Sequence, residues 1–336
     1  MSTSLYRNVG PFSVHPVGLG CMNLSHAYGT PPPPAEGERL LLRALDLGAT
    51  LFDTAALYGF GANETLVGRV LKAHRSRITL CSKGGMAGLK GDDGVLRRVI
   101  DGRPEAIRRN CEDSLRRLGT DVIDLYYLHR WDKQVPIEDS VGEMSRLVTE
   151  GKVRALGLSE VSAPVLRRAH AMHPIAALQT EYSLWTRNPE IAVLQACADI
   201  GAAFVAFSPL ARAFLTDTLH DLSTLTEKDL RRTMPRFQGG AWAANLRLLP
   251  GYLAVAQELG CTPAQLALAW VLAQGQHVVV IPGTAQVAHL EDNMGAAAVT
   301  LTPAHLQRLD ALINARTVTG PRYNAAAQAD VDTENF

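Results

Sequence analysis

The chain has 336 residues, with 33 lysines and arginines balanced by 33 aspartates and glutamates. A formal net charge of zero argues against binding to nucleic acid or to an anionic membrane through net positive charge. Hydrophobic residues make up 47% of the chain and charged residues 20%, which excludes a disordered or collagen-like protein and indicates a large buried core.

Eight short apolar or β-branched segments have the pattern of buried parallel strands, which are apolar on both faces. In chain order the predicted strands are Val17–Gly20, Thr50–Asp53, Arg77–Ser82, Val122–His129, Val153–Ser159, Ala176–Thr180, Ala202–Ser208 and Val278–Pro282. Helical patterns lie between them, and several begin at a proline and end before a glycine, which is typical of helix termini. These predicted helices are Ala35–Leu47, Pro104–Leu118, the stretch from Asn188-Pro189 to Gly201, and the stretch from Thr262-Pro263 to Gly275. We interpret the arginines of the second one as a solvated face rather than an anion site.

This alternation predicts an α/β fold, a (β/α)8 TIM barrel, in one domain spanning residues 1–336. A doubly wound sheet is the main alternative, but no G-x-G-x-x-G follows the first strand. We expect residues 1–15 to form a hairpin or lead-in and residues 317–336 a C-terminal tail. The wide spacing between the last two strands predicts an insertion, in which residues 217–245 form a long loop on the active face.

The five cysteines, at positions 21, 81, 111, 197 and 261, are odd in number and lack C-x-x-C spacing. They make a poor disulfide framework, so we expect reduced thiols and a cytoplasmic protein. The longest uninterrupted apolar run, Leu266 to Ala273, is far shorter than the roughly 20 residues needed to span a bilayer. The N-terminal segment also lacks the apolar stretch of a secretory signal.

Four polar side chains lie at strand ends or in the following loops, where a TIM barrel has its active site. Asp53 ends one predicted strand, Lys83 follows the next, His129 ends a third, and Tyr58 lies five residues beyond Asp53. Each residue also has an ordinary structural explanation, such as a helix cap, a rim aromatic, a solvated strand end or a single structural hydrogen bond. Packing alone does not require all four at one barrel mouth, so their convergence favours a catalytic group.

The chemistry that these four side chains could share is proton delivery to a carbonyl oxygen. Tyrosine has an ordinary pKa of about 10, and a neighbouring ammonium favours the phenolate. Lys83 would therefore lower the pKa of Tyr58, Asp53 would keep Lys83 charged, and His129 would orient the substrate oxygen. A hydride would have to come from a cofactor, because no side chain supplies one.

At these residues the sequence resembles the aldo-keto reductase family. Residues 52–59 read FDTAALYG and are followed by Gly61 and Asn63-Glu64, and Ser82-Lys83 and the segment 124–130, DLYYLHR, also match family motifs. Further matches follow in the family's order: Gly157-Leu158-Ser159, Gln179-x-Glu181-Tyr182-Ser183, Phe207-Ser208-Pro209-Leu210 and Ile281-Pro282-Gly283-Thr284. Gly20-Cys21-Met22 and Met234-Pro235-Arg236-Phe237 are similar to the bacterial and plant branch with perakine reductase-like enzymes.

The resemblance implies a TIM barrel that reduces an aldehyde or ketone, or runs the reverse reaction, with a nicotinamide cofactor across its mouth and no metal. Tyr58 would be the general acid, Lys83 and Asp53 its tuning pair, and His129 the carbonyl orienter; we call these four residues the tetrad. The implied cofactor-binding residues are Ser159 and Gln179 at the carboxamide, Phe207 under the nicotinamide ring, Ser208, Leu210 and Arg212 along the pyrophosphate, and Gly283, Thr284, His289, Asp292 and Asn293 at the adenosine end.

Departures from the family pattern bear on the cofactor. Glu160 stands where many members have asparagine, Ala211 where glycine is common, and Asn23 where glycine is frequent. Ala285-Gln286 replace the basic residues that usually hold the 2′-phosphate of NADP, and His289 is the only cation candidate in that stretch. The resemblance to the family favours NADP(H) as the cofactor, whereas the missing basic residues in this stretch are compatible with NAD(H).

The substrate pocket is less defined by sequence. Candidate lining residues are Met22, Asn23, Tyr28, Leu57 and Trp131, together with the 217–245 loop. An apolar lining favours a small-molecule aldehyde or ketone on a hydrophobic body over a highly charged sugar. The oligomeric state is left open.

Three other functions remain as alternatives. A Schiff-base aldolase would use Lys83 as nucleophile, but an adjacent Asp53 keeps the ammonium protonated. A metal-dependent hydrolase would use Asp53, His129, Asp132 or Glu181, although H-x-H and H-E-x-x-H spacings are absent. A cofactor-sensing module, like the potassium-channel β-subunits, would bind nicotinamide without turnover.

Overall fold

The computed structural model describes residues 6–25, 27–91 and 93–336. Within them, the central sheet has eight parallel strands in the order β12-β11-β10-β9-β8-β5-β4-β3. Their bounds are β3 Leu19–Gly20, β4 Leu51–Asp53, β5 Thr79–Gly84, β8 Ile123–Leu128, β9 Val153–Ser159, β10 Ile175–Glu181, β11 Ala203–Phe207 and β12 Val278–Val280. Parallel bridges from Val17 to Val280 and from Gly20 to Gly283 join the two edges, so the sheet closes. All eight strands fall on the predicted segments, and the (β/α)8 barrel is confirmed.

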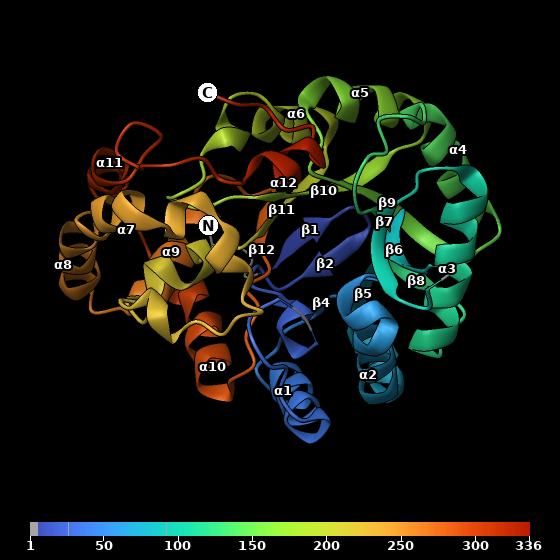
Figure 1. Ribbon diagram of the computed structural model, residues 1–336, viewed down its shortest axis with the longest axis horizontal. Helices are drawn as coiled ribbons and strands as arrows, with labels where there is room; N and C mark the ends of the chain where they lie inside the picture. Colours follow the sequence, from blue (N-terminus) through green and yellow to red (C-terminus); the bar gives the residue numbers. More distant parts are fainter. Residues whose placement is uncertain (1–5, 26, 92) are drawn as a thin grey trace.

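Helices surround the sheet as an outer ring (Figure 1). Those that follow the strands are α1 Pro34–Asp46, α2 Ala62–Leu71, α3 Pro104–Leu118, α4 Ile137–Thr149, α5 Ala163–Met172, α6 Val193–Ile200, α9 Pro263–Leu272 and α10 Val287–Gly295. Local sequence explains their termini, since α1, α3 and α9 have proline in the first turn and Thr262 forms a capping box with Gln265 at α9. Gly119 ends α3 with a φ of 62°, a left-handed conformation that favours glycine. Across the described ranges, no helix is long and apolar enough to cross a membrane.

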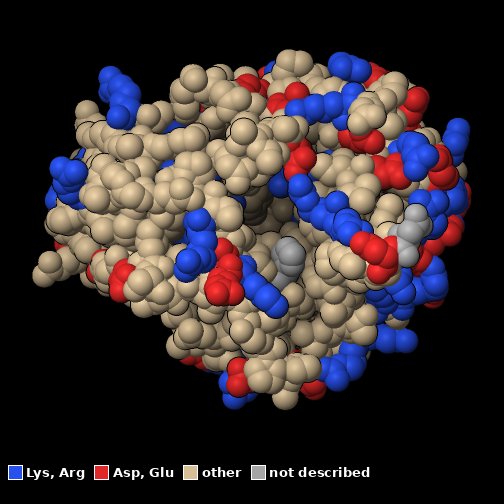
Figure 2. Space-filling view, viewed as in Figure 1, with Lys and Arg blue, Asp and Glu red and all other residues tan. Residues whose placement is uncertain are grey.

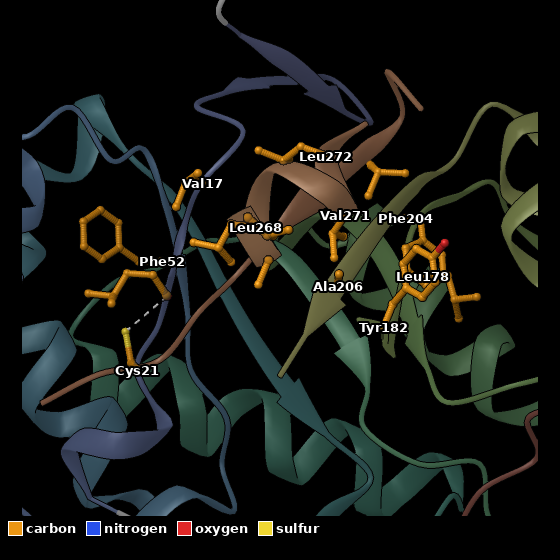
Figure 3. Packing of buried hydrophobic residues seen from close by; sticks show 14 of the residues in the cluster. Val17, Cys21, Phe52, Leu178, Tyr182, Phe204, Ala206, Leu268, Val271 and Leu272 are labelled. Carbon is orange, nitrogen blue, oxygen red and sulfur yellow. Dashed lines mark hydrogen bonds between the residues drawn. The ribbon is translucent and has the colours of Figure 1, made fainter. Parts of the chain in front are cut away.

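The buried core has two layers because alternate residues of a strand point to opposite faces. Leu51 belongs to the cluster that fills the barrel, with Leu125, Val205 and others, whereas Phe52 faces the helices. Figure 3 shows this outer layer, where Phe52, Phe204 and Leu178 from the strands lie near Leu268 and Val271 of α9. Polar side chains near the carboxyl ends of the strands, such as Asp53 and Gln179, lie outside these two apolar layers.

A short antiparallel hairpin, β1 (Arg7–Val9) and β2 (Phe12–Val14), closes the N-terminal opening. Val9 and Val14 are fully buried in the barrel-interior cluster. Arg7 fixes the hairpin by donating to the carbonyl oxygens of Leu272 at 2.9 Å and Gly275 at 2.8 Å. The hairpin therefore leaves the opposite mouth of the barrel as the open one. The first five residues of the expected lead-in lie outside the described residues.

A second hairpin, β6 (Met86–Lys90) and β7 (Leu96–Ile100), stands at the open mouth after β5 and was not predicted. The segment between β11 and β12 also differs from the expected loop. Residues 217–238 do consist of irregular chain with single-turn 3-10 helices, but Gly239–Leu246 forms helix α7, followed by α8 (Leu249–Leu259). Glycine at both first positions of α7 hides its helical pattern in the sequence.

The C-terminal segment, after α11 (Pro303–Leu312), returns across the barrel and includes α12 (Ala325–Ala329). Asp332 forms a parallel bridge with Val161, and its carboxylate accepts from the hydroxyl of Ser162 at 2.7 Å. Lys133 donates to the carbonyl oxygens of Ala329 and Val331. These contacts hold the 317–336 tail over the ends of β8 and β9.

Candidate active site

A cavity of about 640 Å³ opens at the carboxyl ends of the strands. Figure 2 shows it as a hollow near the centre of this face, with basic side chains at its rim. Strand ends, the following loops, the 217–245 segment and the C-terminal tail all contribute to its lining. Three of the tetrad residues, Asp53, Tyr58 and His129, line the cavity, and Lys83 lies behind them.

Lys83, near the end of β5, is completely buried. Its Nζ forms an ion pair with Asp53 Oδ1 from β4, and donates to the carbonyl oxygen of Thr54 at 3.0 Å and to Tyr58 Oη at 3.2 Å. The phenol oxygen therefore accepts a hydrogen bond from Lys83. This contact places the ammonium directly on the oxygen that would carry the phenolate charge.

Burial raises the pKa of Tyr58 above its ordinary value, because the charge of Lys83 only partly compensates. This differs from the sequence-based expectation of a net lowering, which considered the neighbouring cation but not the loss of solvent. Burial lowers the pKa of Lys83, but the carboxylate of Asp53 and the phenol of Tyr58 outweigh it and raise the pKa overall. At neutral pH the pair is therefore a neutral phenol beside an ammonium.

His129 follows β8, and its backbone N–H donates to the carbonyl oxygen of Gly84 at 2.9 Å. Its ring meets the Tyr58 ring edge-on, with 5.8 Å between centroids. The second oxygen of Asp53 accepts from Gln179 Nε2 on β10 at 2.8 Å. Adjacent parallel strands thus bring the four predicted residues together at one point.

Asn63 and Glu64, which follow the FDTAALYG segment, contact residues that adjoin the tetrad. Asn63 accepts from Thr54 Oγ1 at 2.6 Å and donates to the carbonyl oxygen of Cys21 at 2.8 Å. Glu64 is completely buried, accepts from Ser82 Oγ, and forms an ion pair with Arg117 of α3 at 2.6 Å. Arg117, expected on a solvated face, instead neutralises a buried carboxylate.

Ser159, Gln179 and Phe207, which end or nearly end β9, β10 and β11, line the cavity beside the tetrad. Ser159 Oγ accepts from Arg130 at 3.1 Å. Glu160, which follows Ser159, is directed to the C-terminal tail, where its carboxylate pairs with Arg322. The ion pair is almost fully buried.

The middle of the cavity is lined by Ser208, Leu210 and Arg212. This segment is unusual in that Ser208, Ala211, Arg212, Ala213 and Asp217 all have φ between 49° and 74° without being glycine. The guanidinium of Arg212 pairs with Glu181 at 2.6 Å. It also donates to the hydroxyls of Tyr28 at 3.0 Å and of Tyr323 at 3.4 Å. Its Nε is buried and has no acceptor within the part of the chain that the structure describes.

The far end of the cavity lies over β12 and α10. Its lining includes all five residues expected at the adenosine end, namely Gly283, Thr284, His289, Asp292 and Asn293. Thr262, before α9, was missed by the sequence analysis and donates to Asp292 from its hydroxyl at 3.0 Å. No described lining residue between Thr262 and Asn293 is lysine or arginine.

Comparison with known proteins explains this arrangement. Residues 16–314 match the model of the Aldo/keto reductase family. The chain belongs to this family. A probable aldo-keto reductase 1 from Glycine max is 43% identical over 313 residues, which cover 93% of this chain and 89% of that protein.

Solved structures are similar over nearly the whole length. A glycerol dehydrogenase from Gluconobacter oxydans has a TM-score of 0.86 at 30% identity and covers 96% of this chain and 98% of its own. An aldo/keto reductase from Klebsiella pneumoniae, in complex with NADP and acetate, has a TM-score of 0.70 at 28% identity and covers 95% of this chain and 98% of its own. The chain is thus an NAD(P)H-dependent oxidoreductase that acts on carbonyl compounds.

Four of the five residues expected at the substrate pocket of this aldo/keto reductase line the cavity, and one does not. Met22, Asn23, Tyr28 and Leu57 line the cavity, as expected. Trp131 is absent from the described lining; its indole packs against the core and donates to the carbonyl oxygen of Val135 at 2.9 Å. The chain turns sharply after His129 and directs the tryptophan away.

Several lining residues of the reductase were missed. They come from the β6–β7 hairpin, the segment after β8 and the C-terminal tail, and are Met86, Arg98, Arg130, Tyr323, Ala327 and Asp330. No short motif marks them, because they reach the mouth only through the path of the folded chain. Arg98 and Asp330 form an ion pair that joins the hairpin to the tail.

Proposed function

We propose that Tyr58 donates the proton in carbonyl reduction, with His129 orienting the substrate oxygen and Lys83 and Asp53 tuning the phenol. The supporting observation is the hydrogen bond from Lys83 Nζ to Tyr58 Oη, made by a fully buried ammonium that Asp53 neutralises. Tyr58 also lines the cavity, so a bound substrate oxygen can reach its hydroxyl.

The nicotinamide cofactor supplies a hydride to the carbonyl carbon when it is bound. The developing negative charge on the substrate oxygen is then stabilised by His129 and by the proton of Tyr58. Lys83 stabilises the phenolate that remains, and the reverse reaction uses that phenolate as the base. An ammonium held in a dry site does this without solvent reorganisation.

The polar groups along the cavity fit an extended dinucleotide. Ser159 and Gln179 offer a hydroxyl and an amide for the carboxamide, and Phe207 offers a ring face. The buried Nε of Arg212, which has no acceptor among the described residues, suits a pyrophosphate oxygen. Ser208 and Leu210 would lie along the same segment, with Gly283, Thr284, His289, Asp292 and Asn293 around the adenosine.

NADP(H) is the favoured cofactor, and we propose that discrimination against NAD(H) is weak. In support, Ala285 and Gln286 line this end of the cavity, and His289 is the cation candidate among the described lining residues from Thr262 to Asn293. Among those residues no arginine offers a bidentate contact to a 2′-phosphate. Ratios of kcat/KM for NADPH and NADH measure this directly, and a thousandfold preference for NADPH would contradict weak discrimination.

For the substrate, we propose an aldehyde or ketone on a hydrophobic body. Met22, Leu57 and Met86 provide apolar surface next to Tyr58, and Tyr28 adds an aromatic wall. Steady-state assays of aromatic aldehydes against aldoses test the proposal, which fails if only the sugars turn over.

A cytoplasmic location is proposed on the basis of five free cysteines, four of them buried.

The deciding experiment compares the wild type with Tyr58→Phe by the absorbance decay of reduced nicotinamide over a carbonyl panel. We expect kcat to fall roughly 10²–10⁴-fold, the effect of removing a general acid, while cofactor affinity changes little. Near-normal rates would assign the proton to another group. Tight cofactor binding without turnover in the wild type would instead favour a sensing module.

A further inference from the structure

Arg130 differs electrostatically from the other arginines that line the cavity. Arg98 pairs with Asp330, Arg212 with Glu181, and Arg231 with Asp229. Arg130 forms no ion pair with any described carboxylate, although it lies directly after His129. It therefore carries an uncompensated positive charge into the cavity at the chemical end.

Two neutral acceptors fix the position of this charge. Arg130 Nη1 donates to the carbonyl oxygen of His129 at 2.6 Å and to Ser159 Oγ at 3.1 Å. These acceptors come from the ends of the adjacent strands β8 and β9, so one guanidinium nitrogen bridges them. Arg130 thus lies between the backbone carbonyl of His129 and the hydroxyl of Ser159, which is proposed to hold the nicotinamide carboxamide.

Glu160, which directly follows β9, offers no hydrogen-bond donor beside Ser159. Glu160 carries only acceptor oxygens when ionised. Both are occupied, since Arg322 donates to the two oxygens and the backbone N–H of Glu181 donates to Oε1 at 2.9 Å. Arg130 is the cation that contacts Ser159, beside which a carboxamide oxygen would lie.

We propose that Arg130 is a positioning residue that donates to the carboxamide oxygen and favours the reduced cofactor over the oxidised one; this rests on the proposed function. The oxidised nicotinamide ring carries one more positive charge than the reduced ring. A guanidinium without a counter-ion among the described residues repels that charge, and its partial burial strengthens the repulsion relative to bulk water. Burial raises the pKa of Tyr58, and the charges of Lys83 and, more weakly, Arg130 oppose the rise, in agreement with the closeness of Arg130 to the phenol.

The test measures dissociation constants by quenching of tryptophan fluorescence for three probes: NADPH, NADP⁺ and 2′-phospho-ADP-ribose, which lacks the nicotinamide. The wild type is expected to bind NADPH more tightly than NADP⁺. In Arg130→Met, we expect the ratio of the NADP⁺ to the NADPH dissociation constant to fall roughly tenfold. NADPH affinity should fall several-fold through the lost hydrogen bond, and affinity for the fragment should stay unchanged.

Two further variants distinguish charge from shape. Arg130→Lys keeps the charge and should restore most of the ratio. Arg98→Met removes a guanidinium from the same cavity, but one that Asp330 already neutralises, and should change the ratio less than twofold.

The outcomes separate the two proposals. If the wild type binds none of the three probes, the proposed function fails. If it binds all three and Arg130→Met leaves the ratio unchanged, or weakens the fragment equally, the role of Arg130 is wrong while the proposed function stands. An equal effect of Arg98→Met would also overturn it, because the ratio would then follow overall charge.

Discussion

At one end of the cavity, Lys83 and Asp53 form an ion pair with 0% and 4% of their side-chain surface exposed, whereas at the other end Gln286 and His289 are exposed. The first end is built from residues at the carboxyl ends of neighbouring strands, where the sheet fixes every side chain. The second end combines exposed positions of a loop and of α10 with the buried side chains of Thr284 and Asn293. The proposed chemistry is therefore held by the barrel itself, whereas the proposed adenosine contacts come partly from exposed positions that tolerate change.

The two ends should also differ in the cost of substitution. Removing one partner of a buried ion pair leaves an unpaired charge without solvent, which costs roughly 3–5 kcal/mol of stability. A change at an exposed loop position usually alters stability by less than about 0.5 kcal/mol. Substitutions at the tetrad should thus affect both rate and folding, and those near Gln286 only the choice of cofactor.

The largest effect is expected from Lys83→Met. Without the ammonium, Tyr58 loses the charge that stabilises its phenolate, and Asp53 is left buried without a counter-ion. We expect kcat to fall at least about 10²-fold and thermal unfolding to shift several degrees downward. Calorimetry and steady-state assays measure the two effects separately.

The double variant Lys83→Met/Asp53→Asn is the control for folding. It removes both charges, so it should regain most of the lost stability but none of the lost rate. If the double variant regains kcat together with stability, Lys83 contributes only to folding, and the catalytic role proposed for it is wrong.

The second prediction concerns pH. Since the pKa of Tyr58 is raised, the proton stays bound to higher pH than in an ordinary tyrosine. The kcat for reduction should be level through neutral pH and decrease only above about pH 10, by about tenfold per unit. The kcat for alcohol oxidation, which needs the phenolate, should increase with pH where the reduction rate is level, and become level where the reduction rate decreases.

The Tyr58→Phe variant controls this profile, because its residual rate should lose the decrease above pH 10. A decrease in the reduction rate between pH 6 and 8 would point to His129 as the proton donor and would remove the phenol from the mechanism.

The smallest of the three effects is expected at the adenosine end. Gln286→Arg places a guanidinium at an end of the cavity where no described lining residue is lysine or arginine, so the preference for NADPH over NADH should increase roughly tenfold. The ratio of kcat/KM for the two cofactors measures it, with Gln286→Met as a neutral control of similar length. Equal gains for both cofactors would show that the arginine does not reach the 2′-phosphate.

Much of the fold could be predicted because parallel strands buried on both faces have a simple pattern. Val153–Ser159 was predicted with the bounds that the structure shows, and Pro104–Leu118 likewise. The tetrad could be located for the same reason, since strand ends of a closed parallel sheet share one opening. The β6–β7 hairpin was missed because its strands are short and largely exposed, which leaves no hydrophobic signal.

Other features depended on contacts between distant segments. The sequence suggested that Lys83 would make Tyr58 more acidic, but the degree of burial, which outweighs that charge, follows only from packing. The sequence predicted that Arg117 lies on a solvated face, but in the structure it forms an ion pair with the buried Glu64. Trp131 adjoins the His129-Arg130 pair in sequence, yet the turn after β8 directs its indole to Val135.

By itself, the sequence determined the eight barrel strands, the barrel and the four side chains proposed to react, because these follow from local patterns and from the rule that parallel strand ends meet. Only the tertiary structure decided how the tail crosses the mouth, why Glu160 faces Arg322, and which guanidinium in the cavity lacks a carboxylate partner among the described residues. Charges and solvent exclusion act through space, and the distances that set them are fixed only when remote segments pack together.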